Sequence, residues 1–213
     1  MLFSAKTVRT EGDQKDMEHK VIRLKCPGCG AAVSLEQREC EYCQQPLVIS
    51  TFQSVGDMPL PQVNKYAGAY RAALAENPEN IVLNKSAAFC YLKLKLYDRA
   101  QSAFDRAIEE NFDDADLYFY AAICLLKGKR PFLAPRKTLD QAVSYLEAAL
   151  MIEPKGIYHY FSAYLKYDYY ELKHLRIEPG YGRELQSARG LGVTESDKQQ
   201  LFALLGVQRP VGF

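Results

Sequence analysis

Small and apolar residues recur at helical spacing through the middle of the chain, most regularly in residues 81–112. This stretch reads IVLNKSAAFCYLKLKLYDRAQSAFDRAIEENF, with Ala88 on its first half and Ala100, Phe104 and Ala107 on its second. Small residues at such points let two antiparallel helices approach closely, and larger residues fill the groove between them. The pattern therefore predicts one pair of antiparallel helices.

The same positions recur before and after this pair, which predicts a repeat protein. A single pair cannot bury its apolar face alone, so copies have to stack on it. Three series of equivalent positions carry the recurrence: Ala73, Ala107 and Ala149; Tyr70, Phe104 and Leu146; Pro78, Phe112 and Pro154. The first step between copies is 34 residues, and the second is 42 because of an eight-residue insertion. We therefore expect a mainly α fold, a solenoid of antiparallel helical hairpins over residues 63–176.

Local signals place the other helices at about 63–77, from Ala115 onward, at 139–152 and within 157–175. Farther along, Thr194 with Asp197 three residues on is an N-cap pattern, and it opens a helix that ends before Gly206. We expect this helix, within a C-terminal segment of residues 177–213, to cap the last repeat, with docking to a partner as the alternative. Residues 180–192, GYGRELQSARGLG, are glycine-rich, and we expect them to be irregular.

Four cysteines precede the helices in a C-x2-C-x10-C-x2-C pattern: Cys26, Cys29, Cys40 and Cys43. Zn²⁺ takes four thiolates in a tetrahedron, and a two-residue gap lets one tight turn present two sulfurs to the same ion. Strand candidates flank the pattern at 21–25 and 47–50. Residues 20–50 therefore predict a small β module around one structural Zn²⁺, which leaves no open position for catalysis. A redox dithiol is the alternative, but it needs one C-x2-C inside a βαβ pattern.

The remaining N-terminal residues carry few structural signals. Residues 1–19 are polar and without periodicity, which predicts disorder. Residues 51–62 contain prolines and a glycine that break periodicity, which predicts a linker. The sequence has neither the apolar core of a signal peptide nor an apolar run of the ~18–20 residues that a bilayer requires, so we expect a cytoplasmic protein.

Composition and charge remove several function classes. The 213 residues are 48% hydrophobic and carry a net charge of +1, so no global field attracts nucleic acid or membranes. The three histidines do not cluster, and no phosphate-binding glycine loop, nucleophile elbow or paired-carboxylate motif occurs in the sequence. We therefore expect a protein that is not an enzyme.

The insertion at residues 127–137, KGKRPFLAPRK, breaks the repeat and is a candidate for partner binding. It has five bases and no acid, and its candidate residues are Lys129, Arg130, Phe132 and Arg136. A basic loop with an apolar tip can meet an acidic protein, a phosphate or a membrane surface. The alternative is a solvated connector.

A tyrosine-rich stretch at residues 157–175 is the second break in the pattern. Helical spacing aligns Tyr160, Tyr164 and Tyr167 on one face. Tyrosine has an apolar ring and a polar tip, so this face suits contact with the C-terminal segment or with a partner.

The cysteine pattern resembles the zinc-ribbon family, whose CPxCG knuckle is matched by residues 26–30. The second knuckle departs at Gln44, where the family often has glycine. The resemblance raises the question of nucleic-acid binding. Three bases and three acids cancel within residues 21–50, so we favour a ribbon that contacts protein or is structural.

The paired helices with 34-residue spacing resemble tetratricopeptide repeats (TPRs). The resemblance implies a concave groove that is lined by the first helix of each repeat and binds peptides, with Lys85, Phe89, Phe119 and Ile123 as candidates. The apolar members suit an apolar or helical segment better than the carboxylate clamp of one TPR subgroup. The alternative is that Phe89 and Ile123 pack inside.

Together these expectations describe a non-enzymatic adaptor or scaffold for protein partners, with a zinc ribbon as a second contact module. The alternative is a nucleic-acid-associated factor that uses the ribbon and the insertion at 127–137. That alternative requires Lys129, Arg130 and Arg136 to lie on the same side of the molecule as the ribbon.

Overall fold

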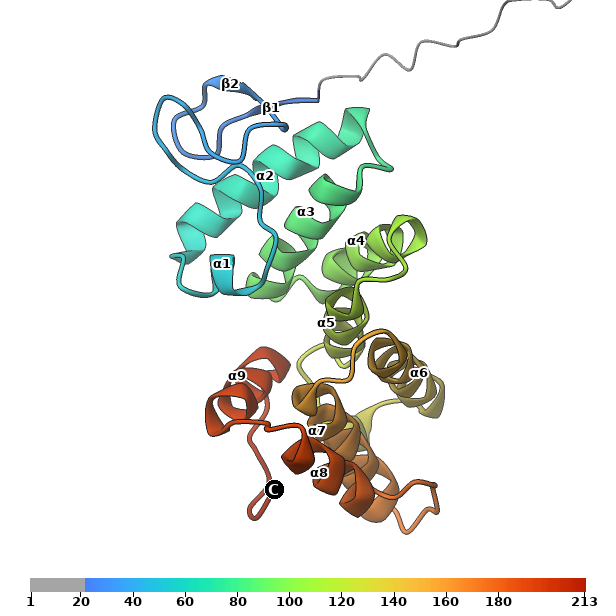
Figure 1. Ribbon diagram of the computed structural model, residues 1–213. Helices are drawn as coiled ribbons and strands as arrows, with labels where there is room; N and C mark the ends of the chain where they lie inside the picture. Colours follow the sequence, from blue (N-terminus) through green and yellow to red (C-terminus); the bar gives the residue numbers. More distant parts are fainter. Residues whose placement is uncertain (1–21) are drawn as a thin grey trace, which may run out of the picture.

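Paired antiparallel helices stack along one axis, with the cysteine-rich segment (residues 22–50) at one end of the stack (Figure 1). The computed structural model describes residues 22–213, and the disordered tail expected at 1–19 lies outside them. The helices are α1 (Gln53–Gly56), α2 (Leu60–Glu76), α3 (Ile81–Lys93), α4 (Tyr97–Glu110), α5 (Ala115–Leu125), α6 (Arg136–Ile152), α7 (Gly156–Leu165), α8 (Tyr181–Gly190) and α9 (Glu195–Leu205). The shorter elements are the strands β1 (Arg23–Lys25) and β2 (Ala32–Ser34), the 3₁₀ turn η1 (Pro131–Leu133) and the π-helix η2 (Lys166–Glu171).

The predicted repeat positions form the core of the stack. Helices α3 and α4, α5 and α6, and α7 and α8 pack as antiparallel pairs. The apolar positions that recur in the second helices are all buried: Ala73, Ala107, Ala149, Tyr70, Phe104 and Leu146. The turns lie outside the core, and Phe112, where two other repeats have proline, is 74% exposed. The expected mainly α, TPR-like solenoid with a small N-terminal sheet is therefore confirmed.

Helix α8 forms where the sequence predicts irregular structure, so that expectation is wrong. α8 packs along α7 and buries Glu184 and Ala188. Its glycines, Gly182 and Gly190, lower helix propensity but are exposed and interrupt no packing. Gly156 at the start of α7 permits the close approach, because a β-carbon there would lie 2.9 Å from the Ala188 carbonyl oxygen. Tertiary packing thus overrides weak local propensity.

Helix α9 begins and ends where the sequence predicts. The Thr194 side chain accepts the Asp197 backbone N–H at 3.1 Å, and the Asp197 carboxylate accepts the Thr194 backbone N–H at 2.9 Å. Gly206 ends the helix in the left-handed conformation, with a φ of 66°. α9 packs against α5 and α7, so it covers part of the face that the first helices of the repeats form.

Strands β1 and β2 pair antiparallel, but the second strand expected at residues 47–50 does not form, and that expectation is wrong. Leu47 and Ile49 are instead fully buried against the helices. We name residues 46–56 the strap, since they run from the cysteine-rich segment across α2 and α3. Hydrophobic burial on the helices replaces the pairing that a second strand would give.

Helix side chains satisfy the backbone polar groups of the strap. The hydroxyl of Tyr66 donates to the Pro46 carbonyl oxygen at 2.8 Å, and that of Tyr70 donates to the Leu47 carbonyl oxygen at 3.0 Å. The Ser86 hydroxyl lies 3.1 Å from both the backbone nitrogen and the carbonyl oxygen of the next buried strap residue, Ile49. These bonds take the place of a strand ladder.

The segment expected as a linker, residues 51–62, is packed rather than free, so that expectation is also wrong. It contains α1 and the first turn of α2. Phe52 is buried, with its ring centroid 5.8 Å from that of Tyr120, and the Lys93 ammonium donates to the Gly56 carbonyl oxygen. The cysteine-rich segment is therefore docked on the helical array.

Among residues 22–213, no helix is both long enough and apolar enough to cross a bilayer.

Candidate metal centre and interaction surfaces

The four predicted metal ligands lie together in the cysteine-rich segment. The sulfur atoms of Cys26, Cys29, Cys40 and Cys43 all lie within 4.8 Å of one another. The Cys26–Cys43 sulfurs are 3.5 Å apart, and the Cys29–Cys40 sulfurs are 3.7 Å apart. A tetrahedral site with metal–sulfur bonds of about 2.3 Å places its sulfurs about 3.8 Å apart. The four cysteines can therefore hold one metal ion.

The two cysteine knuckles share one backbone geometry. The Gly30 backbone N–H donates to the Cys26 carbonyl oxygen at 2.9 Å, and the Gln44 N–H donates to the Cys40 carbonyl oxygen at 2.7 Å. Gly30 and Gln44 both take the left-handed conformation, with φ values of 80° and 59°. Gln44 bears a steric cost there that glycine avoids. Its departure from the family pattern leaves the ligand positions intact.

The thiols of the cluster differ in acidity. Burial raises the pKa of Cys26, but hydrogen bonds from the backbone N–H groups of Cys29 and Gly28 and from neighbouring thiols lower it to about 7. At Cys43 the Gln45 backbone N–H lowers the pKa, but burial and the three neighbouring thiols raise it to about 12. Thiolates this close repel one another, so the four thiols become fully deprotonated only when they bind a divalent cation.

Three of the four residues expected to line the concave groove are core residues. The expectation that their side chains are exposed to a bound peptide is therefore wrong. Phe89, Phe119 and Ile123 are buried. The Phe89 ring lies 6.5 Å from Phe52, and the Phe119 ring lies 5.0 Å from Tyr158, between centroids. The alternative that Phe89 and Ile123 pack inside is the one that holds.

Two segments of the chain itself cover the concave side. Helix α1 packs on α3, and α9 packs on α5 and α7. The fourth candidate, Lys85, is partly exposed, and its ammonium forms an ion pair with Asp114. A partner therefore does not meet the first helices along their whole length.

The basic insertion is fixed to the tyrosine-rich stretch. Arg130 pairs with the fully buried carboxylate of Asp168 in η2. The same carboxylate accepts the Phe132 backbone N–H at 2.8 Å. The Phe132 ring is 39% exposed and lies 4.8 Å from the Lys173 ammonium. Phe132 at the tip of the loop remains partly exposed, but Arg130 is held in an ion pair that stabilises the fold.

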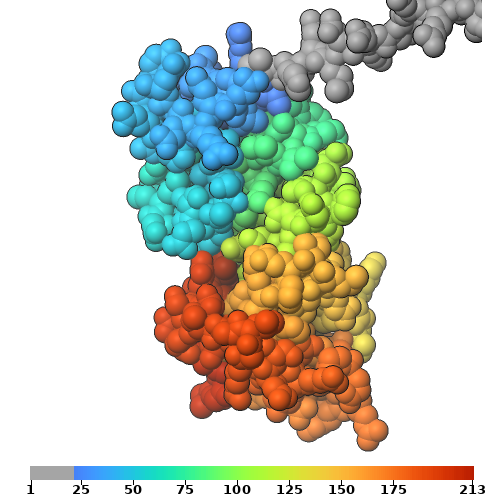
Figure 2. All heavy atoms as spheres, in the orientation of Figure 1, coloured from blue at the N-terminus to red at the C-terminus, as the bar shows by residue number. Residues whose placement is uncertain are grey.

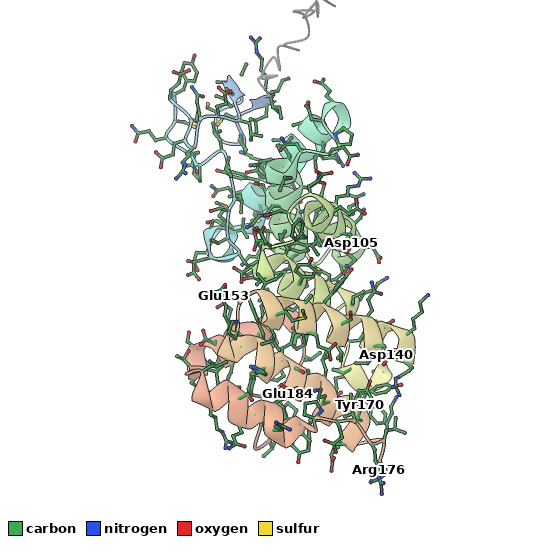
Figure 3. All side chains as sticks on the ribbon, turned by 45° about the vertical axis from the view of Figure 1, so that its right-hand side comes forward. Asp105, Asp140, Glu153, Tyr170, Arg176 and Glu184 are labelled. Atoms are coloured by element: carbon green, nitrogen blue, oxygen red, sulfur yellow. The ribbon has the colours of Figure 1, made fainter. Side chains whose placement is uncertain are left out.

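The second arginine of the insertion is also paired. Arg136 donates to Asp140 at 2.7 Å, and Tyr170 donates to the same carboxylate at 3.1 Å, in the lower half of the molecule (Figure 3). Lys129 is exposed, and no ion pair to it occurs within residues 22–213. Figure 1 places the α5–α6 connection well away from β1 and β2. The nucleic-acid alternative requires these cations to lie on the same side of the molecule as the ribbon, and they do not.

The tyrosine stripe contacts the C-terminal segment, which is one of its two expected roles. Tyr160 and Tyr164 are buried. The Phe202 ring of α9 lies 4.9 Å from Tyr164, and the Phe213 ring lies 5.4 Å from Tyr160 and 5.2 Å from Tyr167, between centroids. The stripe is therefore occupied from within the chain.

A groove of about 960 Å³ remains between α1 and α9, and no residue of the sequence analysis pointed to it. Figure 2 shows these two segments, cyan and red, facing each other across the waist of the molecule. The groove has apolar walls with carboxamides among them: Met58, Leu60, Leu92, Leu94, Leu204, Gln53, Asn64, Gln199 and Gln200. Local sequence signals cannot reveal it, since its walls come from segments far apart in the sequence, at residues 52–64, 92–95 and 196–204.

Comparison with known proteins finds similarity to tetratricopeptide repeats. A tetratricopeptide repeat model matches residues 67–130. The solved structure MamA MSR-1 C2 has a TM-score of 0.51 and 19% identity, covering 70% of this chain and 74% of that chain. MamA AMB-1 C2221 also has a TM-score of 0.51, with 18% identity over 66% of this chain and 74% of that chain. A thermophilic TPR protein of Thermus thermophilus, TTC0263, has a TM-score of 0.49 and 21% identity over 68% and 74%. The repeat match and the MamA likenesses support a TPR array in the helical part of this chain.

Proposed function

We propose that this chain is a non-enzymatic adaptor that binds an apolar peptide segment of a partner protein in the groove between α1 and α9. TPR arrays support a protein-interaction role, and the groove is the observation that carries the more specific proposal. Its volume and its mixture of apolar walls with a few polar groups are those of a binding site. Leu60, which is 53% exposed on its wall, is an apolar group that a partner can cover.

The polar groups of the groove favour a peptide backbone over a charged ligand. Four carboxamides can each donate and accept, as an extended peptide requires. The charged side chains of the lining are Asp57, Lys93 and Lys95, and the Lys93 ammonium already donates to the Gly56 carbonyl oxygen. A hydrogen bond to a carbonyl oxygen does not neutralise that ammonium, so the one acid and two bases of the lining leave only a small positive net charge. A neutral, apolar segment therefore fits best.

The groove proposal predicts that negative charge on α9 abolishes partner binding. Gln199 and Ala203 are exposed residues of the lining, one helical turn apart. The double variant Gln199→Glu/Ala203→Glu should fold normally and lose its partner, because two carboxylates would be buried under an apolar segment. The measurement is co-purification of the full chain from native cells, with circular dichroism to verify folding.

A matched control places two carboxylates on the outer surface of α6, with Gln141→Glu/Ser144→Glu, where both residues are exposed. This variant should keep the wild-type partner. If the α9 variant and the α6 variant retain the same partner equally, the groove is not the binding site.

We further propose that the metal is a single structural Zn²⁺. Four thiolates at tetrahedral spacing suit zinc and fill its coordination. Free thiols persist in a reducing compartment, which supports a cytoplasmic location. Metal analysis of protein purified without added metal should find one zinc ion per chain. A zinc content well below one, or a different metal at full occupancy, would contradict the assignment.

A further inference from the structure

We propose that the free edge of β1 binds an acidic, extended segment of a partner protein as an added antiparallel or parallel β-strand. A second groove, of about 630 Å³, lies between this strand and α2. Arg23 and Lys25 line it from β1, and Lys65, Gly68 and Ala72 line it from α2. This surface is separate from the groove between α1 and α9, so it can be tested independently of that proposal.

Within the part of the chain that the structure describes, the strand ladder leaves one edge of β1 without a partner. Leu24 lies opposite Val33. The Cys26 N–H donates to the Ala31 carbonyl oxygen, and the Leu35 N–H, just after β2, donates to the Ile22 carbonyl oxygen. In an antiparallel pair, alternate residues direct their backbone groups to opposite edges. The N–H and C=O groups of Arg23 and Lys25 therefore point away from β2. Among residues 22–213, no strand pairs with that edge.

The charges along this edge indicate an acidic partner. Arg23, Lys25 and Lys65 are exposed, and none of them has an ion pair within the described part of the chain. Glu76 is the one acid among the lining residues. Metal-bound thiolates add negative charge nearby, so the net charge of this region does not favour an acidic segment. The preference for acidic residues therefore has to come from direct pairing with these three basic side chains. Opposite charges on paired strands stabilise the pairing.

The α2 wall of the groove has room for the side chains of an added strand. A β-carbon built on Gly68 has no other atom within 4 Å, so the space beside it is open. Ala72, one turn further along α2, is exposed. An added strand satisfies the free backbone groups of β1 while its alternate side chains enter this space, which is the geometry of β-augmentation.

The test is fluorescence anisotropy with the full, zinc-loaded chain and a short capped peptide that alternates glutamate with valine. We expect binding that weakens as salt is raised, and binding about tenfold weaker for the same peptide with lysine in place of glutamate. The variant Gly68→Leu fills the groove without a clash and should weaken binding by about tenfold as well. The amides of Arg23 and Lys25 should gain protection from hydrogen exchange when the peptide binds.

The matched control is Gly182→Leu in α8, where a β-carbon also has no other atom within 4 Å. It should bind the peptide like the wild type, and so should Gln199→Glu/Ala203→Glu. Equal binding of the lysine peptide, unchanged binding by Gly68→Leu, or no binding at all would overturn the proposal. Preference for a single-stranded oligonucleotide over the acidic peptide, or dimerisation through this edge, would overturn it too.

Discussion

Replacing Cys40 with serine is expected to destabilise the helical array as well as the cysteine-rich segment. A structural zinc ion contributes about 10–16 kcal/mol of apparent binding free energy in small zinc domains. With the zinc ion proposed above, losing one of its four ligands would remove a large share of that free energy. The segment has few other sources of stability, since its sheet consists of two three-residue strands. It should therefore unfold in the variant.

The strap should transmit this loss of stability from the cysteine-rich segment to the helical array. When the strap leaves, the buried rings of Tyr66 and Tyr70 face water, and Ser86 loses both bonds to the backbone of Ile49. Hydrogen exchange followed by mass spectrometry should show faster exchange in α2 and in the first half of α3, with α8 unchanged. A zinc chelator added to the wild type should reproduce the pattern.

The control is the same chelator added to the Cys40→Ser variant, which should cause no further change. If the cysteine-rich segment loses protection while α2 keeps its wild-type exchange rate, the segment is a tethered module. The docking described above would then contribute nothing to the stability of the array.

The variant Glu184→Gln is expected to lose about 3–5 kcal/mol of unfolding free energy, the usual cost of removing one partner from a buried ion pair. Glu184 lies on α8 (Figure 3). Its carboxylate accepts from Lys166 at 2.5 Å and lies 2.7 Å from the Nδ1 atom of His159. The Lys166 side chain is only 4% exposed. Without the carboxylate, its ammonium is left buried and unpaired between α7 and α8. Urea unfolding measures the loss.

The same carboxylate predicts an acid-dependent loss of stability. Burial raises the pKa of Glu184, but the bonds from Lys166 and His159 outweigh burial and hold it below the ordinary value of 4.5. A lowered pKa stabilises the folded state fully above that ordinary value, and the contribution is lost as pH falls through the folded-state pKa. As pH falls below the ordinary value of 4.5, the unfolding free energy of Glu184→Gln should thus decrease less than that of the wild type.

The surface variant Glu195→Gln is the control for both measurements. Glu195 pairs with Arg209 and Lys198, but its side chain is 57% exposed. Its loss should cost far less than that of Glu184, because solvent already screens an exposed pair. Equal losses in the two variants would show that the buried cluster makes no special contribution.

Features that depend on local pattern could be predicted from the sequence. Ala73, Ala107 and Ala149 recur because each occupies the equivalent buried position in its own repeat, and this recurrence fixes the stacking. The capping box of Thr194 and Asp197 lies within one turn, so it also needs no distant information. The four cysteines could be predicted as a set for the same reason, since two tight turns fix their spacing.

Features that depend on distant partners could not be predicted. Residues 47–50 have the composition of a strand, but their hydrogen-bond partners on α2 and α3 are not visible in the local sequence. Phe89 has the position of a groove residue, but the segment around Phe52 that covers it has the composition of a linker. The glycines of α8 predicted irregular structure, but packing on α7 makes this segment a helix. The groove between α1 and α9 belongs to the same class.

Tyr70 shows how the docked segment constrains the repeat beneath it. Phe104 and Leu146 occupy the equivalent positions in the later repeats and are wholly apolar, whereas Tyr70 carries a hydroxyl that donates to Leu47. This hydroxyl therefore links the first repeat to the strap. During evolution, residues at positions 66, 70 and 86 should change together with the strap. We expect a tyrosine at this point of a first repeat in related chains whose N-terminal module is docked in the same way.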